Sequence, residues 1–277
     1  MAKKTKSKQT SKEKEVKTKK NKVTSPKKKA KKQKKAPKKT VKKTKSTTKQ
    51  PESLLKTLLE AGCHFGHKKS KIHPKAKKNL YTVRDGIAIF DLIKTKDCLE
   101  EAKKFVSKLV KSGGKIVFLG TKRQAKEIVR EEAEQVGMPF ITNRWLGGTI
   151  TNWEQIKLNS IDRFNDLKKK FESGEFKDRT KKEQSVIKKE INRLRRIVGG
   201  LSGLDQIFGA LFVVDIKTEK TAINEARDKG IPVIAIVDSN CDPELVDYPI
   251  PANDDAAKSI QLLVSEIAKV IKEAKKK

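Results

Sequence analysis

Short, continuous runs of apolar residues recur along the chain, and each run is followed by a stretch with helical periodicity. The runs cover residues 115–119, 210–214 and 232–237. Continuous apolar runs of this length are typical of parallel strands that are buried on both faces. Since the runs alternate with helical stretches, the pattern predicts an α/β fold with a doubly wound parallel sheet.

The helices that follow these runs have boundaries that the sequence indicates. The first is expected to begin at Thr121, which forms a capping box with Gln124 by its spacing. The second is expected to span about residues 218–230 and to end at a glycine. The last is expected to begin near Asn253, with two Asp residues in its positively polarised first turn.

The segment before the first run adds a smaller set of elements. A short amphipathic helix is expected over residues 53–61, closed by Gly62. Residues 79–83 and 87–91 flank a turn and predict a β-hairpin. A helix over residues 94–111 carries apolar residues on one stripe.

Residues 152–198 interrupt the alternation of strand and helix. They contain no strand signal, and two helix-period stretches flank a polar turn at 173–175. Two facing apolar stripes predict an inserted αα-hairpin. Its outer faces are dense in Lys and Arg, which is the ordinary composition of a solvated face.

The first fifty residues have a different composition from the rest of the chain. They hold 23 Lys, no Arg and two Glu, so they carry +21 of the net charge of +33 and leave +12 on the other 227 residues. Because they contain few large apolar residues, we expect a tail that is disordered when free. The tail is either a solubilising arm or an electrostatic arm for nucleic acid. The predicted organisation is a tail at 1–50, an α/β RNA-binding domain at 51–151 and 199–277, and a hairpin at 152–198.

The three cysteines and the overall hydropathy bear on the compartment. The cysteines lie far apart without a Cys-x-x-Cys pair, which favours a reducing compartment over a disulfide framework. No apolar run approaches the roughly 20 residues of a membrane span, and no signal-peptide pattern follows the basic start. A soluble cytoplasmic protein without membrane contact is expected.

The loop at residues 143–152, with the sequence NRWLGGTITN, is the most unusual part of the folded region. Arg144 beside Trp145 offers a cation and an aromatic plane, a pair that stacks on bases or clamps a phosphate. Two glycines allow close approach of the backbone. The alternative is that Trp145 packs at the root of the hairpin, and both roles are compatible with the sequence.

Metal and enzyme chemistry have weaker signals. Asp215, Asp238 and Asp242 follow strands at the edge where open α/β sheets usually bind ligands, so they could hold a divalent cation or could cap helices. Cys63 lies close in sequence to all three histidines, but the spacing matches no zinc signature. Nor does the stretch at 120–122 match a phosphate loop, although Lys122 and Arg123 at a helix start would suit a backbone phosphate.

Six runs of sequence resemble the bacterial-type small-subunit ribosomal protein S2 family: 58–67 (LLEAGCHFGH), 120–125 (GTKRQA), 143–153 (NRWLGGTITNW), 210–215 (ALFVVD), 230–240 (GIPVIAIVDSN) and 250–256 (IPANDDA). The resemblance covers about residue 53 to the C-terminus and does not include the basic tail. It implies a flavodoxin-like, three-layer α/β/α fold with a protruding helical hairpin. It also implies a structural, non-enzymatic role in the small subunit of a cytoplasmic bacterial ribosome, with binding to 16S-type rRNA late in assembly. The expected protein partners are other small-subunit proteins, including ribosomal protein S1, which the family helps to recruit for translation initiation.

The candidate RNA-binding residues follow from their chemistry, because Lys and Arg bind phosphates and other polar groups bind sugars and bases. They are His64, His67, Lys68, Lys69, Lys75, Lys77, Lys78, Arg84, Lys122, Arg123, Arg144, Trp145 and Asn152. We expect no cofactor beyond Mg²⁺ carried by the rRNA, and no homo-oligomer. Two rival hypotheses are a hydrolase that uses Asp215 and Asp238 as cation ligands, and a DNA condenser driven by the tail.

Overall fold

The computed structural model describes residues 51–276, so the predictions for the tail at 1–50 lie outside the described residues. The main sheet has five parallel strands in the order β5-β4-β6-β7-β8. In chain order its strands are β4 (Ile116–Leu119), β5 (Phe140–Ile141), β6 (Ala210–Val214), β7 (Val233–Val237) and β8 (Tyr248–Pro251). This is the 2-1-3-4-5 order of flavodoxin-like sheets, so the predicted α/β fold is confirmed.

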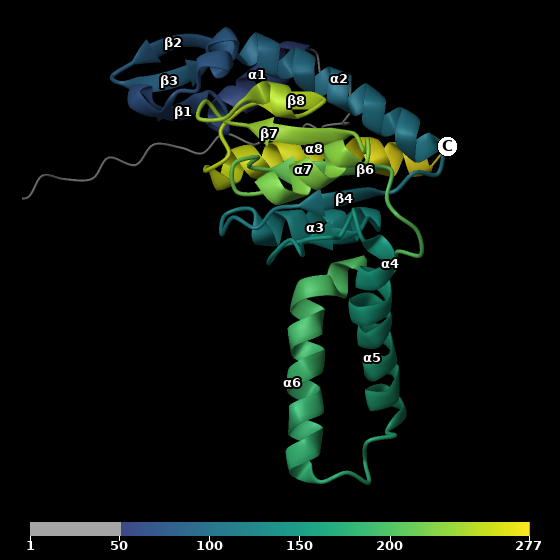
Figure 1. Ribbon diagram of the computed structural model, residues 1–277. Helices are drawn as coiled ribbons and strands as arrows, with labels where there is room; N and C mark the ends of the chain where they lie inside the picture. Colours follow the sequence, from purple (N-terminus) through teal and green to yellow (C-terminus); the bar gives the residue numbers. More distant parts are fainter. Residues whose placement is uncertain (1–50, 277) are drawn as a thin grey trace, which may run out of the picture. The chain divides into compact units, whose positions relative to one another are not determined.

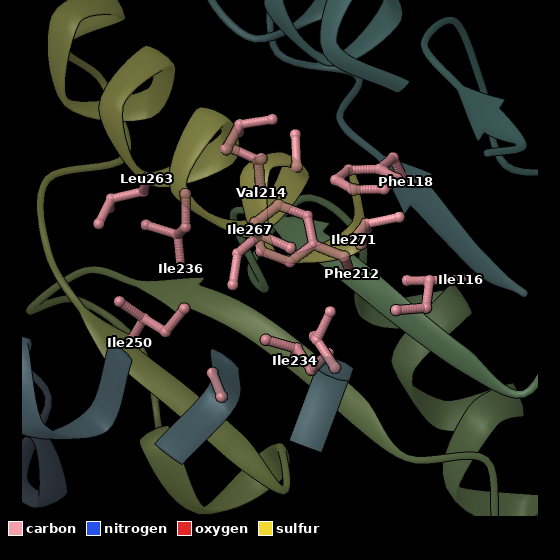
Figure 2. Close-up of a cluster of buried hydrophobic side chains, with 14 of the residues drawn as sticks. Ile116, Phe118, Phe212, Val214, Ile234, Ile236, Ile250, Leu263, Ile267 and Ile271 are labelled. Carbon is pink, nitrogen blue, oxygen red and sulfur yellow. The ribbon is translucent and has the colours of Figure 1, made fainter. Parts of the chain in front are cut away.

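Two apolar cores lie on opposite faces of this sheet, because successive strand residues point to opposite sides. One face carries Phe118, Phe212 and Ile234 and is covered by α2 (Leu92–Lys111), α3 (Lys126–Val136) and α8 (Ala257–Lys275). Figure 2 shows these strand side chains meeting Leu263, Ile267 and Ile271 of α8. The first helix, α1 (Pro51–Glu60), also packs against this core through Leu58.

The other face of the sheet is covered by α7 (Lys220–Asp228) and by the root of the helical hairpin. Its core includes Val117, Leu211 and Val213 from the strands, with Ile161 and Val198 from the hairpin. The fold therefore has three layers, and the hairpin contributes to one of them.

The inserted hairpin has two long arms, which Figure 1 shows side by side below the labels α4 and α3. The first arm comprises α4 (Trp153–Ile156), a π-helical segment (Lys157–Asp162) and α5 (Arg163–Ser173). The second arm is α6 (Lys181–Val198), which begins with a capping box between Thr180 and Glu183. A short 3₁₀ turn, Gly199–Leu201, returns the chain toward the sheet.

A second, three-stranded antiparallel sheet has the order β1-β3-β2. Its strands are β1 (Phe65–Lys68), β2 (Leu80–Arg84) and β3 (Ile87–Phe90). The predicted hairpin is β2 and β3, whose turn places Asp85 and Gly86 at positive φ of 50° and 74°. Strand β1 was not predicted.

Two predicted helix starts are wrong. Helix α3 begins at Lys126, since the Thr121 hydroxyl donates a hydrogen bond to Glu219 and does not cap a helix. Helix α8 begins at Ala257, since the Asn253 side chain accepts hydrogen bonds from the backbone of Asp255 and Ala256 in a turn that precedes the helix.

Within residues 51–276, no helix is both long and apolar enough to cross a lipid bilayer.

Candidate nucleic-acid interface

Lys122 follows β4 and lies among three carboxylates at the C-terminal edge of the main sheet. Its Nζ is 2.7 Å from Asp254 Oδ1, 2.9 Å from Asp255 Oδ1 and 3.1 Å from Asp215 Oδ2. The side chain is 18% exposed, and two of the three acids are buried. Lys122 is therefore an internal counter-ion, and since α3 begins only at Lys126, the phosphate site predicted at a helix start beside Lys122 is not formed.

The protonation of this cluster is shaped by burial and by its neighbours. Burial raises the pKa of the Asp254 carboxyl, and repulsion from Asp238 and Asp215 raises it further. Burial also opposes ionisation of Asp215, but hydrogen bonds from Thr218 and the Lys122 ammonium bring the pKa of its carboxyl below the usual value. For Lys122 itself, burial is outweighed by the hydrogen bonds to its acidic neighbours, and the pKa of the ammonium is raised. The lysine therefore stays charged at neutral pH.

His67 connects the small sheet to the same edge of the main sheet. Its Nδ1 lies 3.0 Å from Asp238 Oδ1, and its backbone N–H donates to Ser239 Oγ at 2.8 Å. The hydrogen bond with Asp238 raises the pKa of the imidazole, against the effect of burial. His67 thus fastens β1 to the loop after β7, a structural role that the sequence did not predict.

The lysines between β1 and β2 divide into two groups. Lys75 lies 2.9 Å from Asp242 and 2.7 Å from Glu244, and Lys78 lies 3.1 Å from Glu244. These contacts connect this segment to the 3₁₀ turn Pro243–Leu245, and the Asp242 carboxylate among them is only 18% exposed.

The second group consists of exposed cations that have no acidic partner on another segment within residues 51–276. The Arg84 side chain is 81% exposed, and its Nε lies 3.8 Å from the equally exposed Asp85, a pair that water screens. Lys68, Lys69 and Lys77 are exposed near it in sequence, on or beside β1 and β2. Of the other predicted residues, Arg123, Arg144 and Asn152 are exposed and His64 is half-buried.

The loop at residues 143–152 is organised by one buried carboxylate, Glu225 of α7. Its oxygens accept hydrogen bonds from the indole Nε1–H of Trp145 at 3.1 Å and from the backbone N–H of Gly148 at 2.8 Å and Ile150 at 3.0 Å. Trp145 is only 7% exposed and belongs to the core under the hairpin. Trp145 therefore packs at the root of the hairpin, as the structural alternative expected, and leaves little indole surface for a base to stack on.

Each of the three aspartates considered as metal ligands already has a protein partner. Asp215 accepts from the Lys217 N–H and the Thr218 hydroxyl, Asp238 contacts His67, and Asp242 caps a 3₁₀ turn through the Glu244 N–H. Within the described part of the chain, no three His, Cys, Asp or Glu side chains converge as a metal site. The Lys122 ammonium supplies the positive charge among Asp215, Asp254 and Asp255.

Sequence reasoning missed two buried acids, Glu225 under the loop at 143–152 and Asp254 beside Lys122. Glu225 lies on the apolar stripe of α7 between Ile223 and Ala226, and an acidic residue on a buried stripe is the signal that could have revealed it. Asp254 was assigned to the first turn of a helix, yet it is 1% exposed. Nothing in its local sequence distinguishes it from Asp255, because its neighbours Lys122 and Asp215 follow other strands, β4 and β6.

One comparison with known protein families bears on this surface. The family model described as "Ribosomal protein S2" matches residues 58–274, which include both sheets and the whole hairpin.

Proposed function

This chain belongs to the ribosomal protein S2 family, and from that premise we propose that it binds small-subunit rRNA through its exposed cations. Members of the family are structural proteins of the small ribosomal subunit and not enzymes. Membership implies a ribosome-associated location and association with the rRNA and proteins of the small subunit. The proposed partner is the 16S-type rRNA of a bacterial cytoplasmic ribosome, bound late in assembly. Any Mg²⁺ at the interface would be carried by the rRNA.

The observation that supports the rRNA proposal is the set of exposed cations on and beside the small sheet that no acid of another segment within residues 51–276 neutralises. Lys68, Lys69 and Arg84 are exposed there, and no acid of residues 51–276 pairs closely with the two lysines. Their long side chains can reach phosphates, and contacts of this kind position a protein on RNA without reading its sequence. Arg123 and Arg144 supply further exposed guanidinium groups.

Recruitment of ribosomal protein S1 for translation initiation is the second part of the proposal. Its support is family membership, together with exposed apolar side chains on the small sheet, Phe65 (48% exposed) and Tyr81 (78% exposed). Such side chains suit a protein partner better than a phosphate backbone. Small subunits reconstituted with a Phe65→Ser, Tyr81→Ser variant should retain rRNA and lose ribosomal protein S1 in sedimentation; unchanged S1 content would contradict this assignment.

The rRNA proposal is tested by two pairs of substitutions that remove the same charge. Lys68→Gln with Lys69→Gln removes unpaired cations, so it should weaken binding to a small-subunit rRNA transcript about ten-fold at 100 mM salt. Lys75→Gln with Lys78→Gln removes lysines that already contact Asp242 and Glu244, so a phosphate would have to replace those acids. It should lower affinity much less, measured by filter binding.

Co-sedimentation of the chain with small subunits at low and high salt completes the test. Failure to sediment with them would overturn the proposed role. Equal loss of affinity in the two lysine pairs, with subunit association intact, would overturn only the assignment to the small sheet.

A further inference from the structure

We propose that a cationic cleft at the root of the helical hairpin is a second binding site for RNA backbone phosphates. The cleft has a volume of about 680 Å³ and lies where α3, β5, α5 and α6 meet. The inference rests on the proposed rRNA-binding function and adds to it a site whose cations are absent from the residues predicted by sequence.

Four cations and one carboxylate line the cleft. The cations are Arg130 of α3, Lys168 of α5, and Arg195 and Arg196 of α6, and the acid is Glu134. Within residues 51–276, neither arginine of α6 has an ion pair. Arg196 Nε donates to the carbonyl of Asn192 at 3.2 Å, which leaves the other nitrogens of its guanidinium for a ligand.

The other two cations have only exposed partners on their own helices. Arg130 pairs with Glu127, one turn earlier, and Lys168 Nζ lies 4.0 Å from Glu172. Exposed pairs of this kind contribute little and exchange readily for a stronger partner. A phosphate in the cleft would therefore meet an excess of positive charge.

The shape of the cleft is fixed by backbone contacts. A Cβ atom on Gly200 would lie 2.2 Å from the carbonyl oxygen of Phe140, so only glycine lets the end of α6 approach β5 this closely. On the same side, the Asn143 side-chain amide donates to the backbone carbonyl of Arg196 at 2.6 Å. These two contacts hold the α6 arginines beside the sheet before any ligand binds, which reduces the entropy that binding would cost.

The chemistry favours an RNA backbone over a stacked base. Guanidinium groups offer two parallel N–H donors that match phosphate oxygens. Two aromatic rings line the cleft: Phe164 is buried, at 5% exposure, and Phe140 is only partly exposed, so a base would find little aromatic surface on which to stack. The site would bind phosphates and position the hairpin on the RNA, without specifying sequence.

The test compares two double variants with equal charge loss on the same two helices. Lys168→Gln with Arg195→Gln removes cations of the cleft, and Lys169→Gln with Arg193→Gln removes exposed neighbours that do not line it. Both double variants are made in the full chain, so the basic tail adds the same RNA affinity to each. Binding of a small-subunit rRNA transcript should weaken about ten-fold in the cleft variant and no more than about three-fold in the other.

The salt dependence gives a second readout. The slope of log affinity against log salt should decrease in magnitude by about 1 to 2 more in the cleft variant than in its control, because one or two phosphate contacts are lost. Thermal unfolding midpoints within about 3 °C of wild type would show that both variants fold.

Two outcomes would overturn the inference. Equal losses in the two variants, with normal wild-type binding, would show only a general effect of charge. If the wild-type chain fails to bind the transcript at all, this inference and the proposed function are both wrong.

Discussion

At the scale of a single residue, Lys122 shows how this protein differs from other open α/β sheets, which bind a ligand at this edge. In an open α/β sheet, the crevice beyond the carboxyl ends of the strands is the usual place for a ligand. Here the Lys122 ammonium lies among Asp215, Asp254 and Asp255 at that edge. A side chain of the chain itself provides the cation that these acids need.

Replacing Lys122 by Met should therefore destabilise the protein strongly. Two buried carboxylates would lose their counter-ion, and removal of one partner from a buried ion cluster costs about 3 kcal/mol. Urea unfolding followed by circular dichroism measures the loss. The control is Lys258→Met on the exposed side of α8, which should change the free energy of unfolding by less than about 0.5 kcal/mol. Equal losses of stability in the two variants would contradict the assigned role of the Lys122 cluster.

His67 should give the stability a dependence on pH near neutrality. Its pKa is raised in the folded state by the hydrogen bond with Asp238, with Asp254 and Asp255 adding to the effect. A raised folded pKa gives stability that is fully present below the unfolded value of about 6.5 and is lost as pH rises through the folded value.

The difference between wild type and His67→Gln isolates this contribution. Asp254, whose pKa is also raised, remains in both proteins and acts in the same direction. The stabilisation of wild type over the variant should be largest at pH 6 and should shrink toward pH 8.5 in urea titrations. A difference that stays constant across this range would contradict the assigned protonation.

At the scale of elements, segments with a clear apolar pattern were predictable, and strands without one were not. Strands β4, β6 and β7 are continuous apolar runs buried on both faces, and their sequences identify them. Strand β5 has two residues, and β8 contains Pro249 and Pro251, which a sequence reading excludes from a sheet. Strand β8 lies at the edge, where a proline lacking an N–H is tolerated.

The joint between the hairpin and the sheet gives the element-scale prediction. Gly200→Ala would place a methyl group against the Phe140 carbonyl and should cost about 2 to 3 kcal/mol. Gly203→Ala, three residues later, meets no atom within 4 Å and should be nearly neutral or slightly stabilising. The unfolding midpoints of the two variants test this close approach. Similar midpoints would mean that the backbone at Gly200 can move away from the Phe140 carbonyl at little cost.

At the scale of the whole molecule, the positive charge has two parts with different expected roles. The first fifty residues carry +21, all from Lys, and lie outside the family match at 58–274. Every Arg of the chain lies in the remainder, where some cations are neutralised and others are free. Lysine lacks the planar fork of arginine that suits paired phosphate contacts.

Deleting residues 2–50 should therefore lower RNA affinity in a strongly salt-dependent way and leave incorporation into small subunits intact. Filter binding at several salt concentrations and sucrose-gradient sedimentation measure the two properties separately. Loss of incorporation in the shortened chain would contradict this expectation and would show that the tail takes part in subunit assembly.

The sequence by itself determined the α/β architecture, the inserted hairpin and the family, because each depends on apolar periodicity or on contiguous motifs. Tertiary structure alone decided which candidate residues are exposed and which are held by other side chains. Trp145 and Lys122 lie in family motifs, yet one is held by Glu225, 80 positions away, and the other by Asp254, 132 positions away. A charge or an aromatic ring is available only if no distant residue packs against it, and chain folding brings such residues together without a local signal.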